Sequence, residues 1–390
     1  MFDNRLKRLI NRRNLLAAAA MTLVAGCAVV PKTQAPVAAP EPPPPAPSMI
    51  PTDTAHHRIA LLVPTTGENG DVGQSMANAA TMALLDTNAT DLRITTYDTS
   101  SDPADAARRA VADGNKLILG PLLADNIAAV SAVAGKAGIP IISFSNDEAA
   151  ASGNVFVMGN LPGQSIVRTV DFARSKGVTT FAALVPRGDY GQRTSSALMN
   201  SVRSGGGTVI AMETFDRSPA SIRAATQRIK AKGGYSALLI ADSGRLSALA
   251  ATEFRAGNAT GPVHLLGTEL WGGEQSVTSS PALRGAWFST VSDQRFGQFA
   301  ASYKSRFGSQ PYRIATLGYD AVLVTLRVAR DWKQGTRFPS EVLYQPGGFL
   351  GLDGPLRFTR GNVVDRALEV REVTAGSVRV VSPAPVKFGD

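Results

Sequence analysis

Short apolar runs alternate with longer amphipathic segments from residue 58 to about residue 270. The runs are rich in Ile, Leu and Val without polar alternation, as expected for strands buried on both faces of a parallel sheet. The segments between them carry apolar residues at helical spacing, and two open with an Asp-Pro or Ser-Pro pair, which is typical of a helix start. The pattern therefore predicts an α/β protein built from repeated βαβ units.

Two such series follow each other along the chain. The strands predicted in the first series are 59–63, 92–97, 117–119 and 139–144, with helices that begin near residues 71, 102 and 125. The second series has predicted strands at 180–185, 208–212, 237–241 and 263–267, with helices over 162–175, after 190, after 218 and over 246–255. Two helices over 293–307 and 312–332 come next, and short antiparallel strands near 349–354, 356–358 and 367–373 close the chain. The two βαβ series predict a protein of two lobes, each built around a doubly wound parallel sheet.

The first 27 residues have the composition of an export signal. Basic residues between Arg5 and Arg13 precede the apolar stretch Leu15–Ala25, which is too short to span a bilayer. The segment ends in Leu23-Val24-Ala25-Gly26-Cys27, which resembles the lipobox of bacterial lipoproteins, in which the cysteine sulfur carries a diacylglycerol. Cys27 is the only cysteine of the chain, and we predict that it is lipidated. The absence of an Asp at position 28 favours the outer membrane, and Arg12-Arg13 leaves the twin-arginine export route open beside the general one.

Residues 28–55 hold nine prolines, including the run Pro42–Pro45. This composition favours an extended polyproline II chain that does not bury apolar surface. We predict a tether between the anchor and the folded body, with a reach of about 3.1 Å per residue. A proline-rich ligand for a partner domain is the second interpretation of this segment.

Composition and charge exclude several functions. The net charge is +9, but five basic residues and one Asp lie within residues 1–27, so the body is only weakly basic and nucleic-acid binding is not indicated. Three histidines and one cysteine exclude a Cys/His zinc site, a Cys–His nucleophile pair and an internal disulfide. The sequence also lacks the usual motifs for phosphate loops, dinucleotide binding, esterases and penicillin binding. We therefore predict a protein that is not an enzyme and uses no cofactor or metal.

Motifs spread over the body fall in the order and approximate spacing of one family. The quoted segments are Ile59–Pro64, Leu119–Pro121, Gly138–Ser143, Asp189–Gln192, Gly267–Glu269, Gly318–Ala321 and Gly351–Phe358. Together they resemble the type I periplasmic binding proteins of the Leu/Ile/Val-binding family. The resemblance implies two lobes joined by three crossovers, with a ligand cleft between them at the carboxyl ends of the strands. We expect lobe 1 to hold residues 56–162 plus about 292–343, and lobe 2 to hold residues 163–291 plus about 344–390.

The resemblance also implies a binding site in the cleft. In family members that capture amino acids, first-lobe hydroxyls and backbone amides hold the α-carboxylate and a second-lobe acid holds the ammonium group. Glu269 stands where that acid would be, but Leu122–Asp125 replaces the expected hydroxyl cluster. The cleft candidates are Thr65, Thr66, Leu122, Asp125, Ser143, Ser145, Asn146, Tyr190, Ser243, Arg245 and Glu269.

Three residues allow further interpretations. Glu269 and Asp320 could form an acid/base pair, but we favour a cleft ligand for the first and a helix cap or lobe-interface hydrogen bond for the second. Trp271 is either a cleft residue or a plug for its own loop.

The anchor, the tether and the fold together resemble the penicillin-binding protein activators of the LpoA family. In that family the C-terminal domain has this fold and stimulates a class A peptidoglycan synthase. This sequence departs from the family because only the tether occupies the place of its N-terminal helical-repeat domain. We expect a lipoprotein on the periplasmic face of the outer membrane that activates a class A penicillin-binding protein. The alternative is a lipid-anchored, branched-chain type amino-acid-binding protein of an ABC importer, with a small amino-acid-like ligand.

Overall fold

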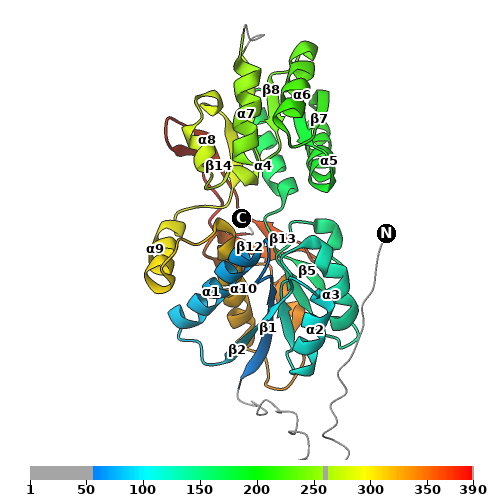
Figure 1. Ribbon diagram of the computed structural model, residues 1–390, viewed down its shortest axis with the longest axis vertical. Coiled ribbons are helices and arrows are strands. Elements are labelled where there is room, and N and C mark those ends of the chain that lie inside the picture. The colour runs from blue at the N-terminus through cyan, green and yellow to red at the C-terminus, as the bar shows by residue number, and fades with distance from the viewer. Residues whose placement is uncertain (1–55, 258–261, 389–390) are drawn as a thin grey trace, which may run out of the picture. The chain divides into compact units, whose positions relative to one another are not determined.

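The computed structural model describes residues 56–257 and 262–388 (Figure 1). The predicted signal segment with Cys27 and the predicted tether 28–55 lie outside these residues. The described chain forms a mixed α/β structure with two main parallel sheets, as the alternation of apolar runs and amphipathic segments predicts.

Lobe 1 contains a five-stranded parallel sheet in the order β2-β1-β3-β4-β5. Its strands are β1 (His57–Val63), β2 (Leu92–Asp98), β3 (Leu117–Leu119), β4 (Ile141–Ser143) and β5 (Val155–Val157). Alternate residues of β1 face opposite sides, since Leu61 joins one apolar cluster and Leu62 the other. Helices α1 (Gly70–Asp86) and α10 (Thr316–Ala329) pack together on the Leu61 side. Helices α2 (Pro103–Ala112) and α3 (Ile127–Ala134) cover the Leu62 side.

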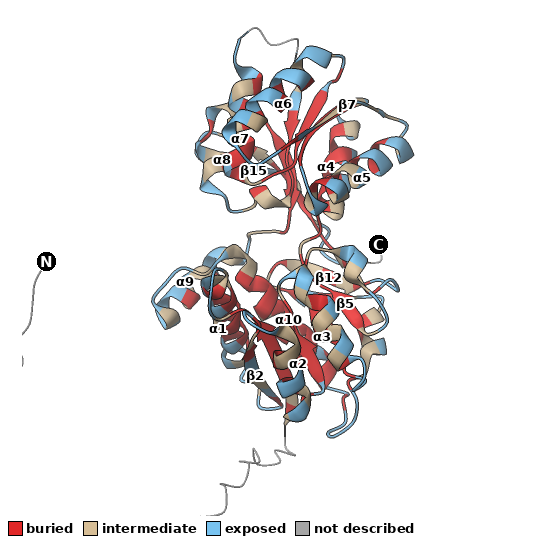
Figure 2. Ribbon diagram, turned by 45° about the vertical axis from the view of Figure 1, so that its right-hand side comes forward, coloured by how far each residue is buried: buried red, intermediate tan, exposed pale blue. Residues whose placement is uncertain are grey.

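Lobe 2 contains a seven-stranded sheet in the order β15-β14-β10-β9-β8-β6-β7. Its strands are β6 (Thr180–Pro186), β7 (Thr208–Phe215), β8 (Ala237–Ile240), β9 (His264–Leu266), β10 (Trp287–Thr290), β14 (Glu369–Val373) and β15 (Val378–Ser382). The first five are parallel, and β14 and β15 extend the sheet in antiparallel fashion. The inner strands β6, β8, β10 and β14 are mostly buried, whereas the edge strands β7 and β15 and the outer sides of the flanking helices are more exposed (Figure 2).

Four helices flank the sheet of lobe 2. Helices α4 (Pro162–Ser175) and α5 (Asp189–Ser204) pack on one face, where Val170 and Leu198 share a cluster with Ala183. Helices α6 (Pro219–Lys232) and α7 (Gly244–Arg255) pack on the other face, and the short α8 (Gln275–Ser279) contacts α7.

A small antiparallel sheet formed by β11 (Phe349–Gly351), β12 (Gly354–Phe358) and β13 (Val364–Arg366) belongs to lobe 1, as does α9 (Phe296–Phe307). We expected the chain to return to lobe 2 near residue 344, but it does so only at β14. The reason is that the apolar side chains Phe349, Leu356 and Phe358 join the core around Leu61. The three crossovers between the lobes are therefore residues 158–161, 291–295 and 367–368.

Local signals explain the starts of helices α2 and α6. Asp102 accepts a hydrogen bond from the Asp105 amide at 2.8 Å and caps α2, and Ser218 accepts one from the Ser221 amide at 3.3 Å and caps α6. In both helices a proline follows the cap, as predicted. Helix α1 differs, because it begins at Gly70 and places Asp71 in the first turn rather than at the cap.

Candidate functional site

A cavity of about 530 Å³, here called the cleft, is lined by residues of both lobes. Leu122 follows β3, Ser145 and Asn146 follow β4, and Glu269 follows β9. These positions are the carboxyl ends of parallel strands, where ligands of open α/β sheets bind. The other residues that line the cleft are Asn69, Val72, Leu123, Ala124, Phe144, Asn160, Leu270, Gly272, Glu274, Tyr312, Arg313 and Ile314.

Seven of the predicted site residues lie outside the residues that line the cleft: Thr65, Thr66, Asp125, Ser143, Tyr190, Ser243 and Arg245. Asp125 is exposed in a single 3-10 turn, Ala124–Asn126, that its side chain does not cap. Ser243 precedes α7 without a side-chain cap, and Arg245 is exposed in the first turn of that helix.

The threonines after β1 are engaged by Asp98, at the end of β2. The Thr65 amide donates to one Asp98 oxygen at 2.9 Å, and the Thr66 hydroxyl donates to the other at 2.7 Å. Burial alone would raise the pKa of Asp98, but these hydrogen bonds and those from Ser100 outweigh it and hold the pKa well below its usual range. Asp98 therefore binds the loop after β1 as an ionised carboxylate.

The serines after β4 shape their own loop. The buried Ser143 hydroxyl donates to the carbonyl of Pro121 at 2.9 Å, and the Ser145 hydroxyl accepts from the amide of Asp147 at 3.0 Å. Asn146 accepts a long hydrogen bond of 3.5 Å from Arg193. Of these two serines only Ser145 lines the cleft, so few free hydroxyl donors face it.

Glu269 combines a strongly shifted pKa with an unpartnered carboxyl oxygen. One of its carboxyl oxygens, Oε1, accepts a hydrogen bond from the Tyr190 hydroxyl at 3.0 Å, and that hydroxyl lies 2.9 Å from the Thr268 hydroxyl. The other oxygen, Oε2, is buried and has no partner among the described residues. Burial raises the pKa of Glu269 to about 7, against the opposing effects of its own backbone amide, the Tyr190 hydrogen bond and the positive charge of Arg193.

Tyr190 orients this carboxyl group from outside the cleft. Burial, followed by the charge of Glu269, raises the pKa of Tyr190 well above its ordinary value, so its hydroxyl remains a hydrogen-bond donor. Glu269 can thus accept a hydrogen bond at its second oxygen and can take up a proton near neutral pH.

Arg313 is the only basic residue that lines the cleft within the described part of the chain. Its guanidinium donates to Asp293 at 3.1 Å and to Asp353 at 2.8 Å. Asp293 in turn accepts from the buried Arg371, which also donates to Glu369 at 2.7 Å. A chain of alternating charges therefore joins Glu369 of lobe 2 to Asp353 of lobe 1, and it leaves Arg313 fully engaged.

Asp320 and Trp271 have structural contacts. Asp320 is fully buried and accepts from the Leu352 amide at 2.5 Å, so it holds the turn before β12. Burial, together with the charge of Asp353, raises the pKa of Asp320 to about 7. The Trp271 ring is buried, and its Nε1 donates to the Ser247 hydroxyl at 3.0 Å, which supports the interpretation of this residue as a loop plug.

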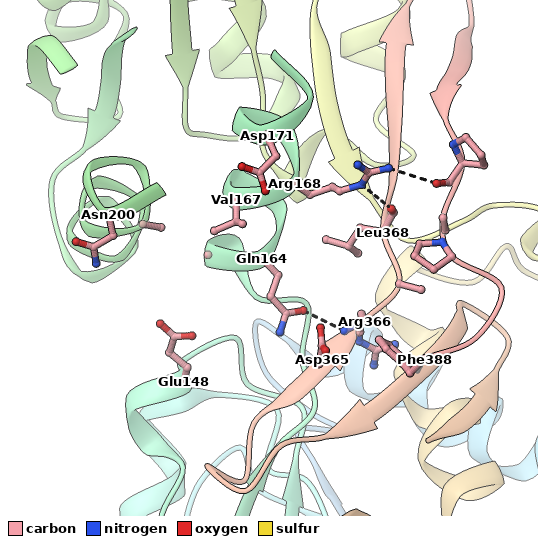
Figure 3. A pocket seen from close by; sticks show the side chains of 16 residues that line it. Glu148, Gln164, Val167, Arg168, Asp171, Asn200, Asp365, Arg366, Leu368 and Phe388 are labelled. Atoms are coloured by element: carbon pink, nitrogen blue, oxygen red, sulfur yellow. Dashed lines mark hydrogen bonds between the residues drawn. The ribbon is translucent and has the colours of Figure 1, made fainter. Parts of the chain in front are cut away.

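A second cavity of about 860 Å³, here called the hinge-side cavity, was not predicted from the sequence (Figure 3). Residues of α4, the third crossover and the C-terminal segment 383–388 line it. Arg168 donates to the carbonyls of Leu368 and Pro383, and Arg357 stacks over the ring of Phe388 at 4.5 Å from its centroid. The C-terminal segment therefore contacts both lobes.

The described residues contain no group of three or more His, Cys, Asp or Glu side chains placed to hold a metal ion. No helix in this part of the chain combines the length and the apolar character needed to cross a membrane.

Comparison with known proteins agrees with this geometry. A family model described as periplasmic binding protein matches residues 57–345. An uncharacterized protein of Rickettsia prowazekii is 29% identical over 173 residues, which is 44% of this chain and 46% of that protein. The chain thus spans less than half the length of that relative.

Solved structures share the fold at low identity. A putative branched-chain amino acid ABC transporter protein of Rhodospirillum rubrum superposes with a TM-score of 0.74 at 23% identity, over 84% of this chain and all of that one. Full-length LpoA of Haemophilus influenzae superposes with a TM-score of 0.65 at 19% identity, over 84% of this chain and 59% of that one.

Proposed function

Because the chain belongs to the periplasmic binding protein family, we propose that it is a binding-protein-like regulator rather than a solute carrier. In this proposal it is lipidated at Cys27, stands on the periplasmic face of the outer membrane, and activates a class A penicillin-binding protein without catalysing a reaction itself. The observation that carries the proposal is the composition of the cleft, whose described lining residues offer a carboxylate no cation other than Arg313, which is already paired with Asp293 and Asp353.

The charges and donors of the cleft support this proposal. Glu269 and Glu274 line it, and Arg313 is engaged by Asp293 and Asp353. The Thr66 and Ser143 hydroxyls donate to protein acceptors outside the lining. An amino-acid carboxylate in this cleft would meet two acids and no free cation, and burying an unpaired charge costs several kcal/mol.

The shared fold with LpoA is compatible with a regulatory role. That protein shares the fold over 84% of this chain, and the Cys27 lipobox with its proline-rich tether is the arrangement of an anchored protein rather than a diffusing carrier. The same likeness extends to a transporter protein, so the partner has to be identified by experiment.

The test measures glycan polymerisation by a class A synthase in the presence of the mature lipoprotein. We expect the rate to rise several-fold, and the synthase to be recovered when the intact lipoprotein is isolated from membranes. A free amino-acid receptor of the same fold serves as the control and should leave the rate unchanged. An unchanged rate with this chain, together with no synthase in the isolated complex, would refute the proposal.

The second candidate is an anchored receptor for an amino-acid ABC importer. One observation favours it: the buried Oε2 of Glu269 is free to accept a hydrogen bond from an ammonium group. A ligand at 100 times its Kd stabilises a fold by about 2.7 kcal/mol, so a thermal-shift screen of the common amino acids detects one directly. A strong shift with one amino acid, abolished in Glu269→Gln, would establish the receptor instead of the regulator.

A further inference from the structure

A small cavity of about 10 Å³ lies where the three crossovers meet. Asn160 of the first crossover, Val291 of the second and Leu368 of the third line it. Arg366, which ends β13 next to the third crossover, and Glu269 of the cleft also line it, together with the polar residues Gln164, Ser165 and Thr290. Because Asn160 and Glu269 line both this cavity and the cleft, the two spaces are neighbours that share these side chains.

Three of the side chains around this cavity each carry a buried polar atom without a partner among the described residues. They are the carboxyl oxygen Oε2 of Glu269, the amide oxygen Oδ1 of Asn160 and the guanidinium Nε of Arg366. Arg366 is only 5% exposed, and its Nη2 already donates to the carbonyl of Met158 at 2.8 Å. Buried polar atoms in folded proteins are nearly always paired, so three unpaired atoms on one cavity indicate a common ligand.

We propose that this cavity is a binding site for a single water molecule. Its volume of about 10 Å³ is just enough to hold one water molecule. Water can accept from Arg366 Nε–H and donate to both Glu269 and Asn160, which pairs all three atoms at once. A metal cation is excluded because the positively charged guanidinium of Arg366 lines the site. An anion is excluded because the carboxyl group of Glu269 lines it as well.

The water links the crossovers to the cleft by hydrogen bonds. It binds the side chain of Asn160 from the first crossover and that of Arg366 beside the third. The carboxyl group that completes the site is the same one that faces the cleft. A ligand or proton that binds Glu269 Oε2 therefore competes with the water for this atom. Through this competition, occupancy of the cleft alters the hydrogen bonds that the water makes to Asn160 and Arg366 at the crossovers. This role does not depend on which partner the protein has.

A crystal structure of the mature protein at high resolution tests the site directly. We expect one density peak within hydrogen-bond distance of Glu269 Oε2, Asn160 Oδ1 and Arg366 Nε. Direct pairing of Arg366 Nε with Asn160 or Glu269, or a cavity without density, would overturn the proposal.

Deuteron or oxygen-17 relaxation dispersion of the solvent counts long-lived buried waters in solution. The variant Asn160→Leu removes one acceptor at nearly constant size, and we expect it to lose one long-lived water relative to the wild type. Asn200→Leu makes the same change at an exposed position of α5 and should lose none. Equal counts in the wild type and Asn160→Leu, with both proteins folded by circular dichroism, would also overturn the proposal.

Discussion

The buried guanidinium of Arg371 offers a sharp test of how the crossovers are stabilised. It is 2% exposed and donates to Glu369, to Asp293 and, at 2.9 Å, to the carbonyl of Val291. In Arg371→Leu all three acceptors lose this donor; Asp293 keeps its hydrogen bond from Arg313, but the carboxylate of Glu369 stays buried without a countercharge. Breaking a buried ion pair by removing one partner costs about 3–5 kcal/mol of folding free energy.

Thermal unfolding followed by circular dichroism measures this loss. For a folding unit of 150–250 residues each kcal/mol shifts the Tm by about 2–4 °C, so Arg371→Leu should lower the Tm by about 6–20 °C. The double variant Glu369→Leu/Arg371→Leu replaces both charges by apolar groups and should recover part of the loss, because no buried carboxylate is left unpaired at Glu369.

A matched control is available on the neighbouring strand. Arg379 of β15 pairs with Glu372 at 2.8 Å but is largely exposed, and such pairs contribute about 0–1 kcal/mol. Arg379→Leu should therefore lower the Tm by only a few degrees. If Arg371→Leu shifts the Tm no more than this control, or if the double variant is less stable than Arg371→Leu, the assigned role of the buried charge chain is wrong.

Three further predictions concern other parts of the chain. Burial raises the pKa of Glu269 to about 7 from an unfolded value near 4.5, so the stability this group contributes is present below about pH 4.5 and is lost as the pH rises through 7. In denaturant titrations, the stability advantage of Glu269→Gln over the wild type should therefore grow between about pH 5 and pH 8 and reach about 3 kcal/mol. An advantage that does not depend on pH would contradict the burial of the charge. Cys27→Ser should move the protein from the membrane to the soluble fraction, because the chain has no other thiol to acylate, and continued membrane association would rule out the lipoprotein prediction. Limited proteolysis should cut between residues 31 and 55 and leave the body from residue 58 intact, since proline-rich chain does not bury apolar surface, and early cuts inside the body would argue against this division.

The sequence predicted the parallel α/β architecture because its long strands leave a clear apolar signal. Strands such as β1 and β6 are unbroken apolar runs, and the caps Asp102 and Ser218 mark helix starts by residue type. The strands β5, β10, β13 and β15 were not predicted, although strands as short as β3 were. Their placement depends on contacts made far along the chain.

The candidate site was harder to predict than the fold. The resemblance to the Leu/Ile/Val-binding family placed Glu269 and Leu122 at the cleft, and both residues line it. Thr66 is hydrogen-bonded to Asp98, and Arg313 is hydrogen-bonded to Asp293 and Asp353. In each case the partners are distant in sequence. Local pattern does not reveal whether a polar group faces a ligand space or a protein partner, so the composition of the cleft emerged only from the structure.

The contacts of the C-terminal segment 383–388 have a practical consequence for protein production. An affinity tag fused behind this segment would be attached next to the Phe388 ring that Arg357 covers and close to the wall of the hinge-side cavity. Such a fusion would disturb the contacts that residues 383–388 make with both lobes. It would therefore bias any binding or activation assay made with the tagged protein. A removable tag allows the tagged and untagged forms to be compared in the same assay.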